Sequence, residues 1–181
     1  MRSLGLLAAC LLHGCGSSRE QTAFYSFEGS LQGWTPQALD VGTPAWSVTT
    51  DPGAPYDGPS SVRLGIENGA ANGLIWMEQT FALSGVVGHR AHVDFAVLGS
   101  VDPPPADRLI VGVLPSPPRN VDALQPALQA QGIGGTQWTQ HAYEFDVRGA
   151  FATVVVGVAA ANPGRTVYHL DALTVRFVEA P

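Results

Sequence analysis

Hydrophobic and polar residues alternate along most of the chain after Thr22, with a period of two. Val62, Leu64 and Ile66, for example, alternate with Arg63 and Gly65. This period places successive side chains on opposite faces of an extended strand, whereas a helix would show a period of 3.6. Further runs of the same kind lie at residues 75–83, 92–97, 109–113, 142–147 and 167–178. The pattern therefore predicts a series of short strands, each with one apolar face.

Two segments depart from simple alternation. Residues 152–161 are apolar at nearly every position, which is typical of a central strand covered on both faces. Residues 120–131 have an apolar spacing that fits one or two helical turns, interrupted by Pro126. Segments rich in Pro, Gly and Asp separate the predicted strands. Short strands between such turns predict an all-β fold, an antiparallel β-sandwich.

The N-terminal residues carry a different pattern, a short basic start followed by the apolar run 4–12. This run has the length of a secretory signal and is too short to span a bilayer. Gly14-Cys15 and the polar residues after it resemble a bacterial lipoprotein signal, in which the cysteine receives diacylglycerol. We expect a signal peptide at residues 1–14, a lipidated tether at 15–21 and the folded domain at 22–181.

Cys15 is the predicted lipidation site, with Cys10 as the alternative. A plain signal peptide with incidental cysteines is a further alternative. The residues after Cys15, with no Asp directly behind it, resemble those of lipoproteins sent to the outer membrane. We therefore expect an exported protein anchored there by its lipid alone, facing either the periplasm or the outside. No cysteine follows position 15, so the domain has no disulfide and depends on its own core.

Composition and charge exclude several classes of function. The chain has 181 residues, a net charge of −6 and nine basic residues, all of them Arg. Without lysine there is no P-loop and no Schiff-base chemistry, and an acidic chain offers no broad basic surface for nucleic acid. The Gly-x-Ser-x-Gly and His-Glu-x-x-His motifs are absent from the sequence as well. We therefore expect a protein that is not an enzyme.

Residues 24–34, which read Phe-Tyr-Ser-Phe-Glu-Gly-Ser-Leu-Gln-Gly-Trp, resemble the opening strand of galactose-binding-like jelly rolls. That group includes many carbohydrate-binding modules. Residues 77–81, 88–95, 138–145 and 168–175 are similar to later strands of the same group. The resemblance implies a single jelly-roll sandwich and a glycan or polysaccharide as the partner.

Asp171 has the strand parity of Leu173 and Val175, which predicts that it points toward the core. A buried carboxylate has to be paired, hydrogen-bonded or bound to a metal. In the resembled family a Glu and an Asp at the positions of Glu28 and Asp171 often help to bind a structural Ca²⁺. The resemblance thus implies a calcium site completed by backbone carbonyls. An Arg partner or backbone hydrogen bonds are the alternative.

Two tryptophans have the parity of outward-facing residues. Trp76 lies beside Glu78 and opposite the apolar positions of its strand, and Trp138 has the parity of Gln140. Indole rings stack on pyranose rings, and neighbouring polar groups bond the hydroxyls. Arg63 and Asp94 also have outward parity, so the predicted ligand contacts are Trp76, Trp138, Glu78, Arg63, Asp94 and Gln140. The alternative is that both tryptophans only cap the sandwich.

These observations predict a non-catalytic lipoprotein of the cell envelope that binds carbohydrate. A structural or assembly lipoprotein that docks a protein partner is the alternative. A glycan-active enzyme is a third, since Glu78 and Asp94 on one sheet face would supply the two carboxylates of glycoside hydrolysis.

Overall fold

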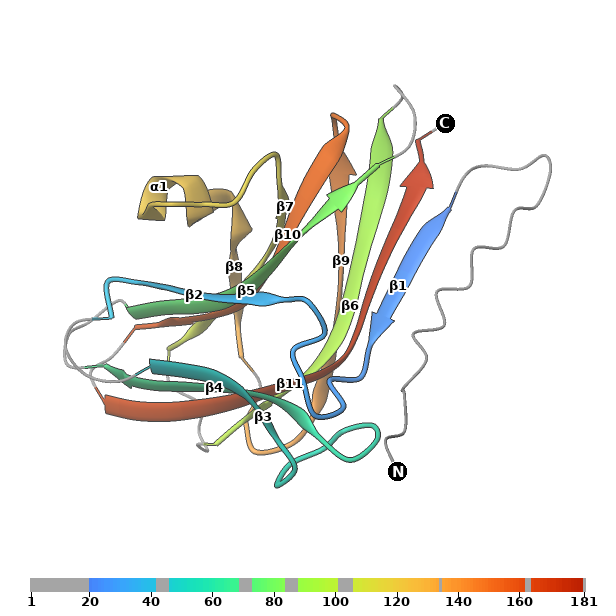
Figure 1. Cartoon of the computed structure of the whole chain (residues 1–181). Coiled ribbons are helices and arrows are strands. Elements are labelled where there is room, and N and C mark those ends of the chain that lie inside the picture. Colours follow the sequence, from blue (N-terminus) through green and yellow to red (C-terminus); the bar gives the residue numbers. More distant parts are fainter. Residues whose placement is uncertain are drawn as a thin grey trace, which may run out of the picture.

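Two antiparallel β-sheets packed face to face make up the structure, a computed structural model that describes residues 20–41, 46–68, 73–83, 88–100, 106–133, 135–161 and 164–180 (Figure 1). The predicted lipidation site Cys15, its alternative Cys10 and the signal peptide lie outside the described residues. No helix in the described part is long and apolar enough to cross a membrane. The predicted all-β antiparallel sandwich is confirmed.

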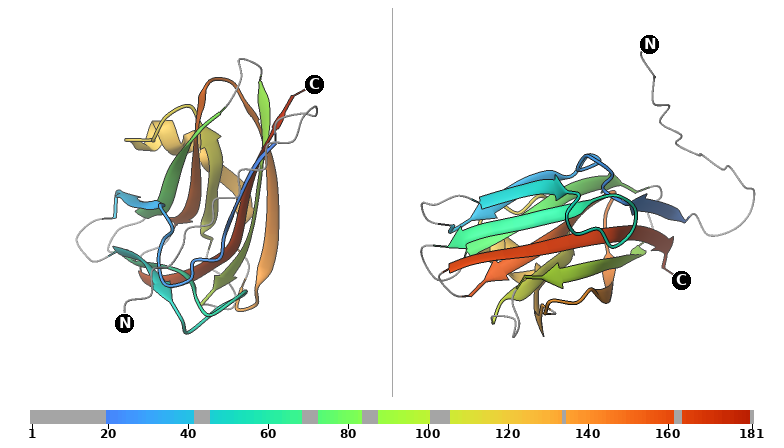
Figure 2. Two further views of the ribbon diagram at one scale, coloured as in Figure 1. Left: turned by 45° about the vertical axis from the view of Figure 1, so that its right-hand side comes forward. Right: turned by 90° about the horizontal axis from the view of Figure 1, so that it is seen from below.

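Sheet A has six strands. Their order is β3 (Trp46–Asp51), β4 (Ser61–Asn68), β11 (Gly164–Glu179), β6 (His89–Gly99) and β9 (Thr139–Val147), and β1 (Gln21–Tyr25) also pairs with β11. The first half of β11 pairs with β4 and its second half with β1. The long strand β11 therefore runs through the middle of the sheet (Figures 1 and 2).

Sheet B has five strands. Their order is β2 (Thr35–Leu39), β5 (Gly73–Ala82), β10 (Phe151–Ala160), β7 (Arg108–Leu114) and β8 (Leu128–Gly132). Strand β10 lies between β5 and β7, so the prediction of a central strand at 152–161 is confirmed. The alternation of hydrophobic residues does not reveal β2, β3 and β8, which are short and each pair with a single neighbouring strand.

The main core fills the space between the sheets, where the apolar faces of both meet. The resembled segment 24–34 contributes to it, because Phe27 and Trp34 are buried and both pack against the ring of Tyr25. A buried pair, Tyr168 and Asp107, closes one part of this core with a hydrogen bond of 2.6 Å from the Tyr168 hydroxyl. Burial and this carboxylate raise the pKa of Tyr168 well above its usual range.

A second, smaller apolar layer lies on the face of sheet B turned away from sheet A. Helix α1 (Val121–Leu124) and the 3-10 turn η1 (Gln125–Ala127) cover this face; the helical turns predicted at 120–131 are present up to Ala127, and β8 begins at Leu128. Asn120 caps α1 by accepting a 2.8 Å hydrogen bond from the Ala123 amide. Gly112 lets η1 approach closely, since a Cβ there would lie 2.7 Å from the Ala127 Cβ. The layer explains why β10 is apolar on both faces.

Candidate functional site

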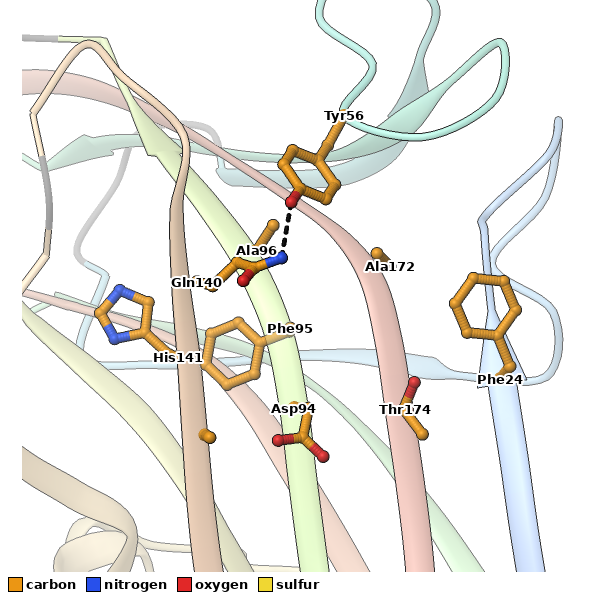
Figure 3. Close-up of a pocket in the computed structure, with 10 residues that line it drawn as sticks. Phe24, Tyr56, Asp94, Phe95, Ala96, Gln140, His141, Ala172 and Thr174 are labelled. Atoms are coloured by element: carbon orange, nitrogen blue, oxygen red, sulfur yellow. Dashed lines mark hydrogen bonds between the residues drawn. The ribbon is translucent and has the colours of Figure 1, made fainter.

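The carboxylate of Asp171 fixes the loop that joins β3 to β4, residues 52–60. One oxygen of Asp171 accepts hydrogen bonds from the amides of Tyr56 and Asp57, at 2.9 and 3.0 Å, and the other from the amide of Ala172 at 2.7 Å. Asp171 is fully buried in this arrangement. The loop is thereby held against sheet A, with the Tyr56 side chain turned over the strands (Figure 3).

The predicted orientation of Asp171 toward the core is wrong, because β11 contains an irregularity at this point. Leu170 pairs with the core residue Val97, and Asp171 pairs with Ala96 on the opposite face. The register between β11 and β6 shifts between Asp171 and Thr174, and Ala172 has a φ of 51°. The extra residue of a β-bulge changes strand parity. The carboxylate therefore lies under the loop. It accepts hydrogen bonds from backbone amides, one of the alternatives considered for Asp171 in the sequence.

A hollow of about 380 Å³ lies beside Tyr56, on the face of sheet A turned away from sheet B, the outer face. It crosses four neighbouring strands, since Phe24 on β1 pairs with Thr174 on β11, Thr174 pairs with Asp94 on β6, and Asp94 pairs with Ala142 on β9. Figure 3 shows these strands side by side beneath the loop. The residues that line the hollow are Phe24, Tyr56, Asp94, Phe95, Ala96, Gln140, His141, Ala142, Ala172 and Thr174.

Aromatic rings stand at both ends of the hollow. Tyr56 packs against Trp138 with a ring separation of 5.3 Å, and the Gln140 amide donates a 2.6 Å hydrogen bond to the Tyr56 hydroxyl. Phe24 lies on the other side, on β1. The side chains are open to solvent, Phe24 at 55% and Tyr56 at 40% exposure. Three strand spacings separate β9 from β1, roughly 14 Å, so the rings flank an elongated surface.

The middle of the hollow is polar. The Asp94 carboxylate and the Thr174 hydroxyl lie on neighbouring strands, and the Gln140 amide lies toward Tyr56 (Figure 3). The His141 ring faces the other side of sheet A, where it stacks on the core residue Phe95 at 5.7 Å, and burial there lowers its pKa. Apolar rings combined with a few polar groups are typical of sites for small polar ligands.

The structure brings together three of the predicted ligand contacts, Trp138, Gln140 and Asp94. Strands β6 and β9 are neighbours in regular register, which places Gln140 opposite Ala96 and so one row from Asp94. Trp138 lies just before β9 and reaches the site through Tyr56. The alternation in the sequence therefore assigned these residues to the face of the sheet on which the structure places them.

Trp76 and Glu78 are corrected by the structure. Both lie on β5 in the other sheet, facing outward as predicted, but α1 and η1 cover them and Trp76 is only 1% exposed. The Trp76 indole donates a 3.0 Å hydrogen bond to Glu78, which also receives hydrogen bonds from Gln37 and Arg119. Trp76 is thus a packed structural residue and not a ligand platform.

Arg63 lies on β4, away from the hollow, where its guanidinium donates a 3.1 Å hydrogen bond to Ser47 and covers Gly65. The pairing of Glu78 with Asp94 as two catalytic carboxylates is also wrong, since one belongs to sheet B and the other to sheet A. Arg63 therefore does not contribute to the hollow, and Glu78 and Asp94 do not form a catalytic pair.

Tyr56 and Phe24 are functional candidates that sequence analysis missed. Tyr56 is the one aromatic residue of the turn-rich segment 51–59, a signal that could have singled it out. Phe24 alternates with the core residue Tyr25 on β1 and so faces outward. The pairing of β1 with β11 places Phe24 at the site, and the hydrogen bonds from the β3–β4 loop to Asp171 place Tyr56 there, two contacts that the sequence does not state.

Glu28, the other predicted calcium ligand, lies at the same loop as Asp171. Its carboxylate occupies the space beside Gly58, one residue from the Asp57 amide that bonds Asp171. Within the described residues, no three His, Cys, Asp or Glu side chains form a metal-binding group. The two carboxylates fit the oxygen chemistry that Ca²⁺ prefers, with carbonyls needed to complete the shell.

Comparison with protein-family models gives no match, and comparison with curated proteins gives none. Solved structures share the fold. The CBM22-1 xylan-binding domain from Paenibacillus barcinonensis Xyn10C has a TM-score of 0.58 and 18% identity, over 92% of this chain and 100% of that chain. TmCBM61, solved in complex with β-1,4-galactotriose, has a TM-score of 0.52 and 13% identity, over 83% and 92%. TmCBM27, described for specific mannan recognition, has a TM-score of 0.50 and 10% identity, over 90% and 99%. The chain thus has the β-sandwich fold of carbohydrate-binding modules.

Proposed function

We propose that this chain is a non-catalytic carbohydrate-binding domain of an exported lipoprotein, with its glycan site in the hollow on the outer face of sheet A. The observation that carries the proposal is the meeting of Tyr56 with Gln140 and Asp94 at one open hollow, where Trp138 supports the Tyr56 ring from outside the lining. Aromatic rings stack on the apolar face of a pyranose, and carboxylate and amide groups bond its hydroxyls. The fold shared with a xylan-binding domain, a module solved with β-1,4-galactotriose and a module described for mannan recognition supports the same chemistry.

The shape of the hollow favours an oligosaccharide that lies across the strands. Trp138 precedes β9 and Phe24 lies on β1, with Asp94 and Thr174 on the two strands between them, and Tyr56 stands over these strands from the β3–β4 loop (Figure 3). A span of roughly 14 Å is longer than one sugar ring. We therefore propose binding of internal or terminal stretches of a few sugar units, with a ring stacked at each end and hydroxyls bonded in the middle.

Alanine at Tyr56 or at Trp138 should lower the affinity for the bound polysaccharide at least about tenfold, or about 1.4 kcal/mol. Tyr56→Ala removes a ring that lines the hollow, Trp138→Ala removes the ring that supports Tyr56, and neither residue belongs to the core. The measurement is affinity electrophoresis, followed by calorimetry, with xylan, β-1,4-galactan and mannan. Trp46→Ala on the far edge strand β3 and Phe151→Ala on sheet B are matched controls, since both rings are exposed outside the hollow. Unchanged affinity in both site variants, or a parent that binds no glycan, would favour the protein-docking alternative.

The lipid anchor is part of the proposal and rests on the sequence around Cys15. Expressed in a bacterium with its own N-terminus, Cys15→Ala should move from the membrane fraction to the soluble fraction, because the acceptor thiol is lost. Cys10→Ala is the matched control and should stay with the membranes. If Cys15→Ala fractionates as the parent does, lipidation at Cys15 is rejected. Protease treatment of intact cells then distinguishes the periplasmic from the outer face of the outer membrane.

We also propose that Glu28 and Asp171 hold a structural Ca²⁺ at the β3–β4 loop. Support comes from the position of both carboxylates around residues 56–58 and from the resemblance to calcium-binding jelly rolls. Bound there, the ion would tie the loop that carries Tyr56 to the sheet. Ca²⁺ should then raise the melting temperature of the parent and not that of Asp171→Ala.

A further inference from the structure

Among the residues that line the hollow, Asp94 is the one with a formal charge at neutral pH. The other polar side chains are the Thr174 hydroxyl, the Tyr56 hydroxyl and the Gln140 amide. The His141 ring stacks on the core residue Phe95 and faces the opposite side of the sheet, so it brings no charge to the hollow. The hollow therefore carries one negative charge between its two aromatic ends.

Among the described residues, no ion pair within 4.0 Å includes Asp94. The cross-strand neighbours of Asp94 are Thr174 and Ala142, both uncharged. The nearest row of charges lies two positions along the strands, where His92 and Arg176 pair in register.

Most of the charged side chains near that row form ion pairs with one another. The Glu144 carboxylate lies 3.2 Å from Nδ1 of His92 and 4.0 Å from the Arg90 guanidinium. The same guanidinium lies 3.6 Å from the Asp146 carboxylate. Arg176, next to His92, is partly buried and does not line the hollow. Of these cations, Arg90 and His92 are thus engaged by acids, and Arg176 lies one row outside the residues that line the hollow.

An unpaired carboxylate discriminates between ligands by charge. It accepts strong, charge-assisted hydrogen bonds from sugar hydroxyls or from an ammonium group. A ligand carboxylate or sulfate in the same hollow would meet like charge where water is partly excluded, which weakens binding. The structure offers no guanidinium in the hollow to receive such an anion.

We propose that the hollow selects glycans built from neutral or amino sugars and rejects glycans that carry uronate, sialate or sulfate groups. This inference rests on the proposed function, because it assigns the ligand class of the same site. Asp94 is the residue that sets the selection, by bonding hydroxyls and repelling anions.

The test compares one polysaccharide in two charge states. The probes are the polymer that the parent binds among xylan freed of its uronate side groups, β-1,4-galactan and mannan, and a carboxymethylated sample of that polymer. At low ionic strength the parent should bind the carboxymethylated polymer at least about tenfold more weakly, and the ratio should shrink in high salt. Asp94→Asn should reduce the ratio to within about threefold. Asp122→Asn on α1 removes the same charge from a distant surface and should keep the parental ratio.

The possible outcomes separate this inference from the proposed function. Equal affinity of the parent for the two polymers, or preference for the charged one, overturns the charge selection and leaves glycan binding standing. A ratio that Asp94→Asn leaves unchanged, or that Asp122→Asn reduces equally, overturns the assignment to Asp94. A parent that binds no polymer rejects the proposed function, and this inference with it.

Discussion

Trp76→Ala should destabilise the fold by about 3–5 kcal/mol, the usual range for a fully buried tryptophan, and should leave the glycan affinity of the folded protein unchanged. Trp76 on β5 is only 1% exposed, because α1 and η1 cover its indole, and it belongs to the second apolar layer. Its removal leaves a cavity there and takes away the donor that bonds Glu78. Glu78 would then keep only its contacts with Gln37 and Arg119, and Arg119 is mostly exposed.

Thermal and urea unfolding followed by circular dichroism measure this effect, and calorimetry well below the melting temperature measures affinity. Trp76→Phe preserves much of the buried area and should lose less, about 1–2 kcal/mol for the missing hydrogen bond and the smaller ring. Trp138→Ala is the converse variant, with lost affinity and retained stability. A folded Trp76→Ala with the parental melting temperature would contradict the burial, and one with reduced affinity would return Trp76 to the ligand site.

Trp76 illustrates which part of the structure the sequence predicts. Alternation along β5 places Ile75, Met77 and Phe81 in the main core and Trp76 on the other face, and the structure agrees. Parity assigns a residue to a face and does not tell what covers that face. The cover comes from α1 and η1, about 45 positions further along the chain, whose docking depends on Gly112 in a third strand. Such contacts leave no local pattern.

The ligand hollow shows the same division. Asp94 and Gln140 are predictable because β6 and β9 are regular and adjacent. Tyr56 is not, because it reaches the hollow through a loop held by a side chain 115 positions away in sequence. The position of Asp171 is not predictable either, because the bulge in β11 reverses the strand parity on which its predicted orientation depends. A loop and a bulge are both set by tertiary contacts.

Asp171→Ala should lower stability by about 3 kcal/mol and should also weaken glycan binding. Its carboxylate satisfies three backbone amides, and hydrogen bonds to a charged group contribute roughly 1.5–3 kcal/mol each. The total stays near 3 kcal/mol because the Tyr56 and Asp57 amides belong to an exposed loop that water can reach once the carboxylate is gone. The released loop would no longer hold the Tyr56 ring over the hollow, so affinity falls although Asp171 does not line it.

Asp107→Asn is the matched control, because Asp107 is an equally buried carboxylate far from the hollow. It accepts hydrogen bonds from the Tyr168 hydroxyl and the Ala161 amide, at 2.6 and 2.8 Å. Asp107→Asn should lose stability and keep the parental affinity at temperatures where it is folded. A loss of affinity in both variants would mean that lowered stability alone weakens binding, and parental values for Asp171→Ala would reject its role in holding the loop.

The same unfolding measurements, made in Ca²⁺ and in EDTA, separate the two ways in which Asp171 can stabilise the loop. If Glu28 and Asp171 bind the ion, Ca²⁺ raises the melting temperature of the parent and of Asp107→Asn, since a ligand of the folded state stabilises it by mass action. Glu28→Gln and Asp171→Ala should then lose this increase, and only Asp171→Ala should also melt lower in EDTA. Equal melting temperatures of the parent in Ca²⁺ and EDTA would reject the calcium proposal. The three amide hydrogen bonds alone would then account for the stabilising effect of Asp171 on the loop, because they need no metal to hold Tyr56 in place.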